Sequence, residues 1–149
     1  MTQGEPRVRT WMLLGYKIPN QPTSGRVFVW RKLRKLGAIL LHDSVWVLPA
    51  TPRTREQLRW LANEISELEG EATLWESRLT LGIDEEKLIG QFTKAVELEY
   101  REILAGLKRK NRDLAALSRQ YQQAKMQDYF DCETGRRVRD ALAADGGKK

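Results

Sequence analysis

His42, Asp43 and Ser44 are residues whose types suggest catalysis, because hydrolytic triads are built from them. They are consecutive, however, and three neighbours on one strand or turn cannot converge as base, orienting carboxylate and nucleophile. Aspartate and serine also favour tight turns, since their side chains hydrogen-bond to nearby backbone groups. We therefore expect a turn with a hydrogen-bonded His42, and no catalytic residues.

The sequence also offers few metal ligands. Its one cysteine, Cys132, and its one histidine cannot build a zinc cage, and a lone cysteine cannot form an intrachain disulfide. An acidic group at residues 84–86 coincides with a predicted helix start, where carboxylates are favoured without any metal. We expect no metal site, no cofactor and no enzymatic activity.

Cations near the N-terminus indicate a polyanion as the partner. On a helical projection of residues 23–36, Trp30, Arg31 and Arg34 share one stripe, opposite an apolar face. A row of cations with an interleaved aromatic ring suits phosphate contact and base stacking. The same pattern also fits a solvated basic face with Trp30 packed against a neighbouring element. The predicted nucleic-acid-binding residues, which include a group near the C-terminus, are Arg26, Trp30, Arg31, Lys32, Arg34, Lys35, Arg136, Arg137 and Arg139.

The start of the same helix offers a second type of site. Ser24, Gly25 and Arg26 follow a loop that contains Pro22, and the unpaired N–H groups of a helix start favour an anion. Phosphate or another tetrahedral oxyanion would fit there, so these three residues are the predicted anion-binding site. Ordinary helix capping by hydroxyl residues explains the same pattern without a ligand.

The elements that must position these residues follow from the spacing of apolar side chains. The apolar run at residues 11–18 predicts a strand, and a helix capped by Thr23 or Ser24 then runs to a terminating Gly37. Residues 38–49 predict two strands joined by a tight turn, with one long bent strand as the alternative.

The order of elements then indicates the fold class. Thr54 and Gln57 match a capping box, and an amphipathic helix follows to Gly70. Residues 71–79 predict a further strand, which completes the order β-α-β-β-α-β of a ferredoxin-like α+β domain.

Helices are predicted for the rest of the chain. Asp84 caps a helix that reaches residue 107, and the polar break near Asn111 favours an antiparallel helical hairpin over one long rod. Because helices cover only one face of such a sheet, we expect this extension or a second copy of the chain to cover the other apolar face. The predicted organisation is a flexible basic arm at 1–9, the ferredoxin-like domain at 10–80, a helical extension packed on it at 84–144 with a short last helix, and a disordered tail at 145–149.

Charge is distributed unevenly along the 149 residues. The net charge is +6, and residues 1–36 hold eight Lys/Arg against one acidic residue, whereas residues 37–100 hold six against twelve. Such a separation can steer a polyanion to one surface. With no run of about 18 apolar residues to cross a bilayer, we expect a cytoplasmic protein without a membrane partner.

Several segments resemble the N-terminal domain of the ChrB chromate-resistance proteins. The most specific are Y-K-I-P, S-G-R-V-x-V-W-R-K-L-R-K-L-G, L-L-H-D-S-V-W-V-L-P-x-T-P-R-T-R-E-Q and G-E-A-T-L-W-E-S-R-L. The likeness continues through R-Q-Y-Q-Q-A-K-M-Q-D-Y-F and T-G-R-R-V-R-D-A-L, and it spans about residues 10–144. It implies a role in regulating chromate-resistance operons, with DNA as a partner and chromate or another oxyanion as an effector.

The same block is similar to the ferredoxin-like module of PaaX-type repressors and of the nuclease-like subunit of CRISPR spacer integration. Those nuclease-like proteins carry an aspartate after the aromatic residue at the end of the first strand, where this chain has Lys17. A charged lysine cannot hold a magnesium ion, so the resemblance implies a binding and dimerising module instead.

The sequence therefore predicts a regulatory protein that binds DNA or another polyanion through its basic helix. The alternative is a protein-interaction or homodimerisation module without direct DNA binding. A third interpretation is an oxyanion-handling protein.

Overall fold

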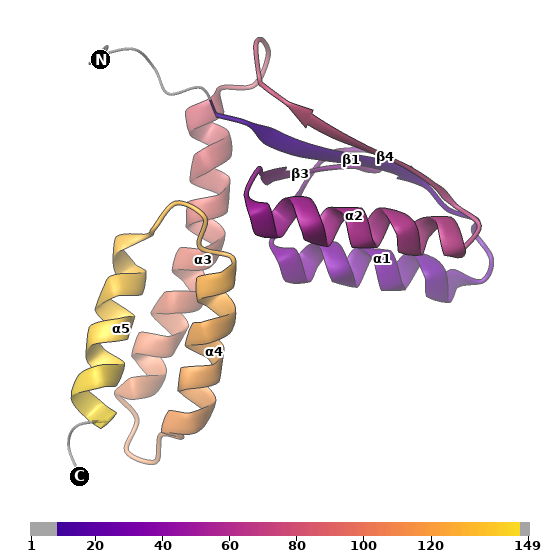
Figure 1. The fold of residues 1–149 in the computed structure, drawn as a ribbon. Helices are drawn as coiled ribbons and strands as arrows, with labels where there is room; N and C mark the ends of the chain where they lie inside the picture. Colours follow the sequence, from indigo (N-terminus) through magenta and orange to yellow (C-terminus); the bar gives the residue numbers. More distant parts are fainter. Residues whose placement is uncertain (1–8, 147–149) are drawn as a thin grey trace. The chain divides into compact units, whose positions relative to one another are not determined.

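The structure, a computed structural model, describes residues 9–146 and divides into two units on either side of the link between Gly82 and Ile83 (Figure 1). The first unit comprises β1 (Trp11–Lys17), α1 (Thr23–Leu36), β2 (Ile39–His42), β3 (Val45–Pro49), α2 (Pro52–Glu67) and β4 (Glu71–Ser77). The second unit comprises α3 (Glu85–Leu107), α4 (Leu114–Met126) and α5 (Glu133–Gly146). The α+β class is confirmed. Most of the predicted arm, residues 1–8, and the end of the predicted tail, residues 147–149, lie outside the described residues.

The sheet of the first unit has the strand order β2-β3-β1-β4, and every neighbouring pair is antiparallel. The two strands predicted within residues 38–49 therefore pair with each other, and β1 lies between β3 and β4. Helices α1 and α2 lie together on one side of the sheet (Figure 1). This is the ferredoxin-like arrangement that the sequence predicts.

Alternation along the strands decides which side chains meet the helices. Leu14 of β1 is paired with Trp46 of β3 and Leu74 of β4, and its side chain is fully buried. The next row, Leu13 with Val47 and Trp75, faces the opposite side, and Trp75 is 59% exposed. The predicted covering of that side by the helical extension or a second copy stays a prediction.

The turn between β2 and β3 is confirmed at the polar triplet. Asp43 has a left-handed backbone with φ of 47°, which aspartate tolerates in tight turns. His42 Nδ1 lies 3.4 Å from Asp43 Oδ2, and both side chains are exposed. The end of β2 and the tight turn account for the conformation of this segment, and the expected absence of catalytic residues stays a prediction.

Helix α1 ends as predicted but begins differently. Gly37 has φ of 80°, and its N–H donates to the carbonyl of Arg34 at 3.0 Å, which ends the helix. The predicted N-cap at Thr23 or Ser24 is wrong, because Pro22 is the N-cap residue and no side chain caps the helix. Both hydroxyl residues instead belong to the first turn.

The N-cap of helix α2 lies three residues before the predicted one, at Thr51 in place of Thr54. Thr51 is the N-cap, its side chain accepts from the Thr54 N–H at 3.0 Å, and the Thr54 hydroxyl closes the box. The assignment of Thr54 and Gln57 is therefore wrong, because Pro52 at the first helical position is already compatible with the helix. Thr54, fully buried, also bonds to the Pro49 carbonyl at 2.6 Å and so joins α2 to β3.

The second unit contains the predicted antiparallel hairpin, with α5 alongside it (Figure 1). Asp84 caps α3 as predicted by accepting from the Glu86 N–H at 3.0 Å. Helix α5 continues to Gly146, and the Arg112 side chain holds Asp145 at 2.9 Å. The buried core of the unit comprises Val96, Tyr100, Ile103, Leu117, Tyr121, Ala124, Cys132 and Val138. None of the helices described between residues 9 and 146 has the length and apolar character needed to cross a bilayer.

A polar link crosses the core of this unit. The hydroxyl of Tyr100, a residue only 1% exposed, donates to Asp128 Oδ2 at 2.9 Å. Asp128 Oδ1 accepts from the Cys132 N–H at 2.9 Å, so both carboxylate oxygens are engaged. Burial of Tyr100, followed by its hydrogen bond to Asp128, raises the pKa of the phenol far above its ordinary value of 10.0.

Tyr100→Phe is expected to lower the free energy of unfolding by about 1 to 3 kcal/mol, because Asp128 loses its donor in a half-buried place. The raised phenol pKa stabilises the wild-type fold fully below pH 10.0, and this contribution is lost as the pH rises above that value. Urea unfolding measured by circular dichroism at neutral and alkaline pH tests both points. If the free energy of unfolding fell equally in wild type and Tyr100→Phe above pH 10.0, the proposed contribution of the Tyr100 phenol would be contradicted.

Candidate polyanion-binding surface

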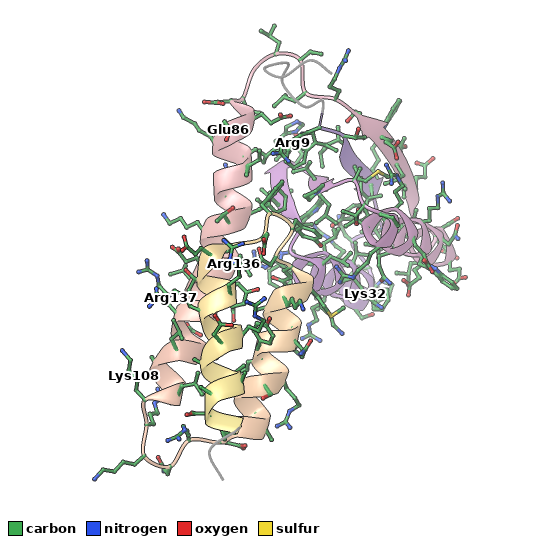
Figure 2. The ribbon with its side chains drawn as sticks, turned by 60° about the vertical axis from the view of Figure 1, so that its left-hand side comes forward. Arg9, Lys32, Glu86, Lys108, Arg136 and Arg137 are labelled. Atoms are coloured by element: carbon green, nitrogen blue, oxygen red, sulfur yellow. The ribbon has the colours of Figure 1, made fainter. Side chains whose placement is uncertain are left out.

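Helix α1 presents most of its circumference to solvent. A single stripe is buried against the first unit, and it consists of Gly25, Val29, Leu33 and Leu36. The apolar face predicted opposite the cation stripe is therefore the face that is buried. The exposed remainder carries five cations and, within α1, no carboxylate; these cations are Arg26, Arg31, Lys32, Arg34 and Lys35. Figure 2 labels Lys32 among the side chains of this helix.

Two aromatic rings lie among these cations. Trp30 is 51% exposed, and the Arg34 guanidinium lies 5.6 Å from its ring centroid. Lys32 Nζ lies 5.5 Å from the ring of Phe28, which is 36% exposed. Each cation is four residues from its ring, so both pairs lie along the helix surface. Trp30 therefore is not packed away against a neighbouring element, as the alternative interpretation expected.

A shallow groove of about 560 Å³ runs along one side of the helix. Its lining comprises Thr23, Ser24, Val27, Phe28, Arg31, Lys32 and Lys35. Phe28 was not among the predicted binding residues, although its four-residue spacing from Lys32 was a usable signal. Apolar side chains and cations thus share this side of α1, which suits a ligand that is both anionic and partly apolar.

The predicted anion site at the start of α1 has a mixed outcome. Gly25 is buried, and a Cβ there would lie 3.3 Å from Ile18 Cδ1, so this glycine serves close packing. Arg26 donates to Asn20 Oδ1 at 3.0 Å across the preceding loop. Ser24 remains exposed beside them. Anion binding by these residues stays a prediction.

Comparison with known proteins supplies the family. Residues 26–127, well over half of the chain, match the family described as "Protein ChrB, N-terminal". The chain belongs to the ChrB N-terminal family. The resemblance found in the sequence is thereby confirmed, and the matched residues include nearly all of α1, from Arg26 onwards.

One relative shows how much of a longer protein the chain represents. Protein ChrB of Cupriavidus metallidurans is 33% identical to it over 60 residues, which cover 40% of this chain and 18% of that protein. The chain therefore matches less than a fifth of the length of this ChrB protein. No solved structure matches the chain.

The arginines near the C-terminus lie on α5, beyond the residues matched to the ChrB N-terminal family. Arg136 pairs with Asp131 at 2.7 Å, and Arg139 pairs with Asp140 at 3.2 Å. Arg136 and Arg137 both leave the first turns of α5 (Figure 2). These residues belong to the second unit, whereas α1 belongs to the first, so a common nucleic-acid surface stays a prediction.

Lys17 is the last residue of β1, at the position where the resemblance to nuclease-like proteins leads us to expect a carboxylate in a metal-binding member. Its side chain is exposed, and its partner in the neighbouring strand is Glu71. An ammonium group at this place would repel a metal ion, and the absence of two-metal phosphodiester cleavage stays a prediction.

Proposed function

We propose that this chain is a regulatory protein associated with chromate resistance, which binds DNA or another polyanion through α1. Membership of the ChrB N-terminal family supports the pathway. The observation that carries the binding role is the exposed face of α1, with five cations, two accessible aromatic rings and no carboxylate within the helix.

The chemistry of this face suits nucleic acid in two ways. The cations can neutralise phosphates and release their counterions, which makes the affinity depend steeply on salt. Trp30 and Phe28 offer apolar contact to bases or sugars, and the neighbouring Arg34 and Lys32 hold positive charge beside each ring. Phosphate contacts of this kind position a protein on DNA, whereas base contacts select a sequence.

The double variant Arg31→Glu/Arg34→Glu is expected to weaken DNA binding by about tenfold or more. It should also lower the slope of log affinity against log salt by about two, one for each lost phosphate contact. Fluorescence anisotropy measures both quantities, with a labelled duplex from the region upstream of the protein's own gene and an unrelated duplex, at several salt concentrations.

The matched control is Lys94→Glu/Arg119→Glu, which changes the net charge equally on exposed residues of α3 and α4. We expect its affinity and salt slope to stay close to those of wild type. The role of α1 would be refuted if the wild-type protein did not bind DNA at low salt, or if both double variants lost DNA affinity equally.

A second candidate function is protein interaction or homodimerisation through the same helix. The specific observation is the groove that Val27 and Phe28 line together with cations, because phosphate contact alone needs no apolar surface. Light scattering of the anisotropy samples distinguishes the two functions. A dimer that forms without DNA and is lost in Arg31→Glu/Arg34→Glu, with no DNA binding by wild type, favours this second function.

A further inference from the structure

The second unit holds a cavity that the proposed function does not use. It has a volume of about 230 Å³ and lies where α3, α4, the following loop and α5 meet. Its lining comprises Tyr100, Tyr121, Lys125, Asp128, Tyr129, Asp131, Gly135, Arg136 and Arg139. Most of these residues come from the two C-terminal segments R-Q-Y-Q-Q-A-K-M-Q-D-Y-F and T-G-R-R-V-R-D-A-L. The proposed DNA binding through α1 does not explain the function of either segment.

Three cations from two helices line this cavity. Arg136 and Arg139 are three residues apart on one side of α5, and Lys125 comes from α4. Lys125 Nζ lies 6.0 Å from the centroid of the Tyr121 ring, four residues earlier on α4. All three cations are exposed at the cavity, so a ligand can reach them from solvent.

The carboxylates of the cavity are already engaged within the protein. Asp128 accepts from the Tyr100 hydroxyl and the Cys132 N–H, both at 2.9 Å. Asp131 accepts from Arg136 at 2.7 Å, so within the lining this carboxylate competes with a ligand for a cation. Arg139 pairs with Asp140, an adjacent residue outside the lining, through an exposed contact of 3.2 Å that contributes little.

We propose that this cavity binds a small anion with several charged oxygens, held by Lys125, Arg136 and Arg139. Two guanidinium groups offer forked donors that match tetrahedral or planar oxyanions, and the ammonium group adds a compact charge. The volume admits a sulfate-sized ion with water or a small dicarboxylate. The lining contains no residue of α1 and none of the predicted anion site at Ser24, Gly25 and Arg26, so the proposal does not depend on the DNA-binding proposal.

The test measures the thermal midpoint of the full chain with added sulfate, phosphate or malonate, against sodium chloride at matched ionic strength. A ligand that binds only the folded state raises the thermal midpoint as its concentration increases, and a bound site gives a concentration dependence from which an apparent affinity is fitted. We expect such a dependence with at least one of the three anions. Sulfate and phosphate compared with malonate distinguish a tetrahedral oxyanion from a dicarboxylate.

The variant Arg136→Gln/Arg139→Gln is expected to weaken the apparent affinity by roughly tenfold or more, because two charged donors are lost. Arg137→Gln, adjacent but outside the lining, and Arg26→Gln, at the predicted α1 site, are expected to keep the wild-type affinity. Lys125→Gln gives an independent check that leaves both α5 arginines in place, should the double variant fold poorly.

Three results would overturn the proposal. The first is a wild-type midpoint that shows no such dependence on any of the three anions. The second is wild-type affinity in both Lys125→Gln and Arg136→Gln/Arg139→Gln. The third is a loss of anion affinity in Arg26→Gln but in none of the cavity variants, which would assign the anion to the start of α1.

Discussion

Gly70→Ala is expected to destabilise the first unit by about 3 kcal/mol, the upper end of the usual cost of overpacking. A Cβ at this position would lie 2.5 Å from the Lys17 carbonyl oxygen and 3.1 Å from that of Ile65. Both contacts are with backbone, which cannot turn aside as a side chain can. The start of β4 would therefore have to move away from the end of β1, with which it pairs.

Urea unfolding followed by tryptophan fluorescence measures this effect, because all five tryptophans lie in the first unit. Gly15→Ala is the matched control, since its Cβ would meet nothing closer than Val45 Cγ2 at 3.9 Å in the same sheet. We expect the control to unfold close to wild type. An equal and small change in the free energy of unfolding of both variants would show that the Lys17 carbonyl can move away from the added Cβ.

Gly135→Ala is expected to destabilise the second unit by about 2 kcal/mol, although alanine is the better helix former. Its Cβ would lie 2.7 Å from Tyr100 Cε2 and 2.9 Å from the Tyr100 hydroxyl oxygen. The ring cannot swing away, because it is buried and its hydroxyl is held by Asp128. The first turn of α5 must shift instead.

The control for this variant is Gly90→Ala in α3, where a Cβ would meet no atom within 4 Å. Helix propensity alone then stabilises the protein, by up to about 1 kcal/mol. Circular dichroism at 222 nm during urea unfolding measures both variants. Stabilisation by Gly135→Ala as well as by Gly90→Ala would contradict the packing of α5 against Tyr100.

The packing roles of Gly70 and Gly135 could not be predicted from the sequence. Gly70 was predicted to end α2, and the helix does end before it, but the left-handed residue is Glu69, with φ of 65°. The glycine is needed for the approach of the Lys17 carbonyl, 53 residues away in the sequence. No packing role was predicted for Gly135, because the local sequence does not distinguish a glycine that is required for packing from one that is merely tolerated.

Periodicity predicted the elements well and their ends less well. Strand alternation and helical spacing report which faces are apolar, so the order of the first unit and the hairpin of the second were recoverable. The two helix starts were misplaced because Pro22 and Thr51 took the cap positions from better-matching residues nearby. Cap choice depends on the backbone path of the preceding loop, which spacing does not contain.

For the candidate site, the spacing of residues along the chain was enough to predict that α1 carries a dense row of cations opposite one buried stripe, because both follow from a fixed helical repeat. The sequence also determined the family, through segments specific enough to be read directly. That Arg136 and Arg139 line a cavity with Lys125 could not be predicted without the folded structure, since residues from different helices meet only once the chain folds. The folded structure likewise shows that Gly25 is a packing residue, because its neighbours Ile18 and Leu68 lie just after β1 and α2.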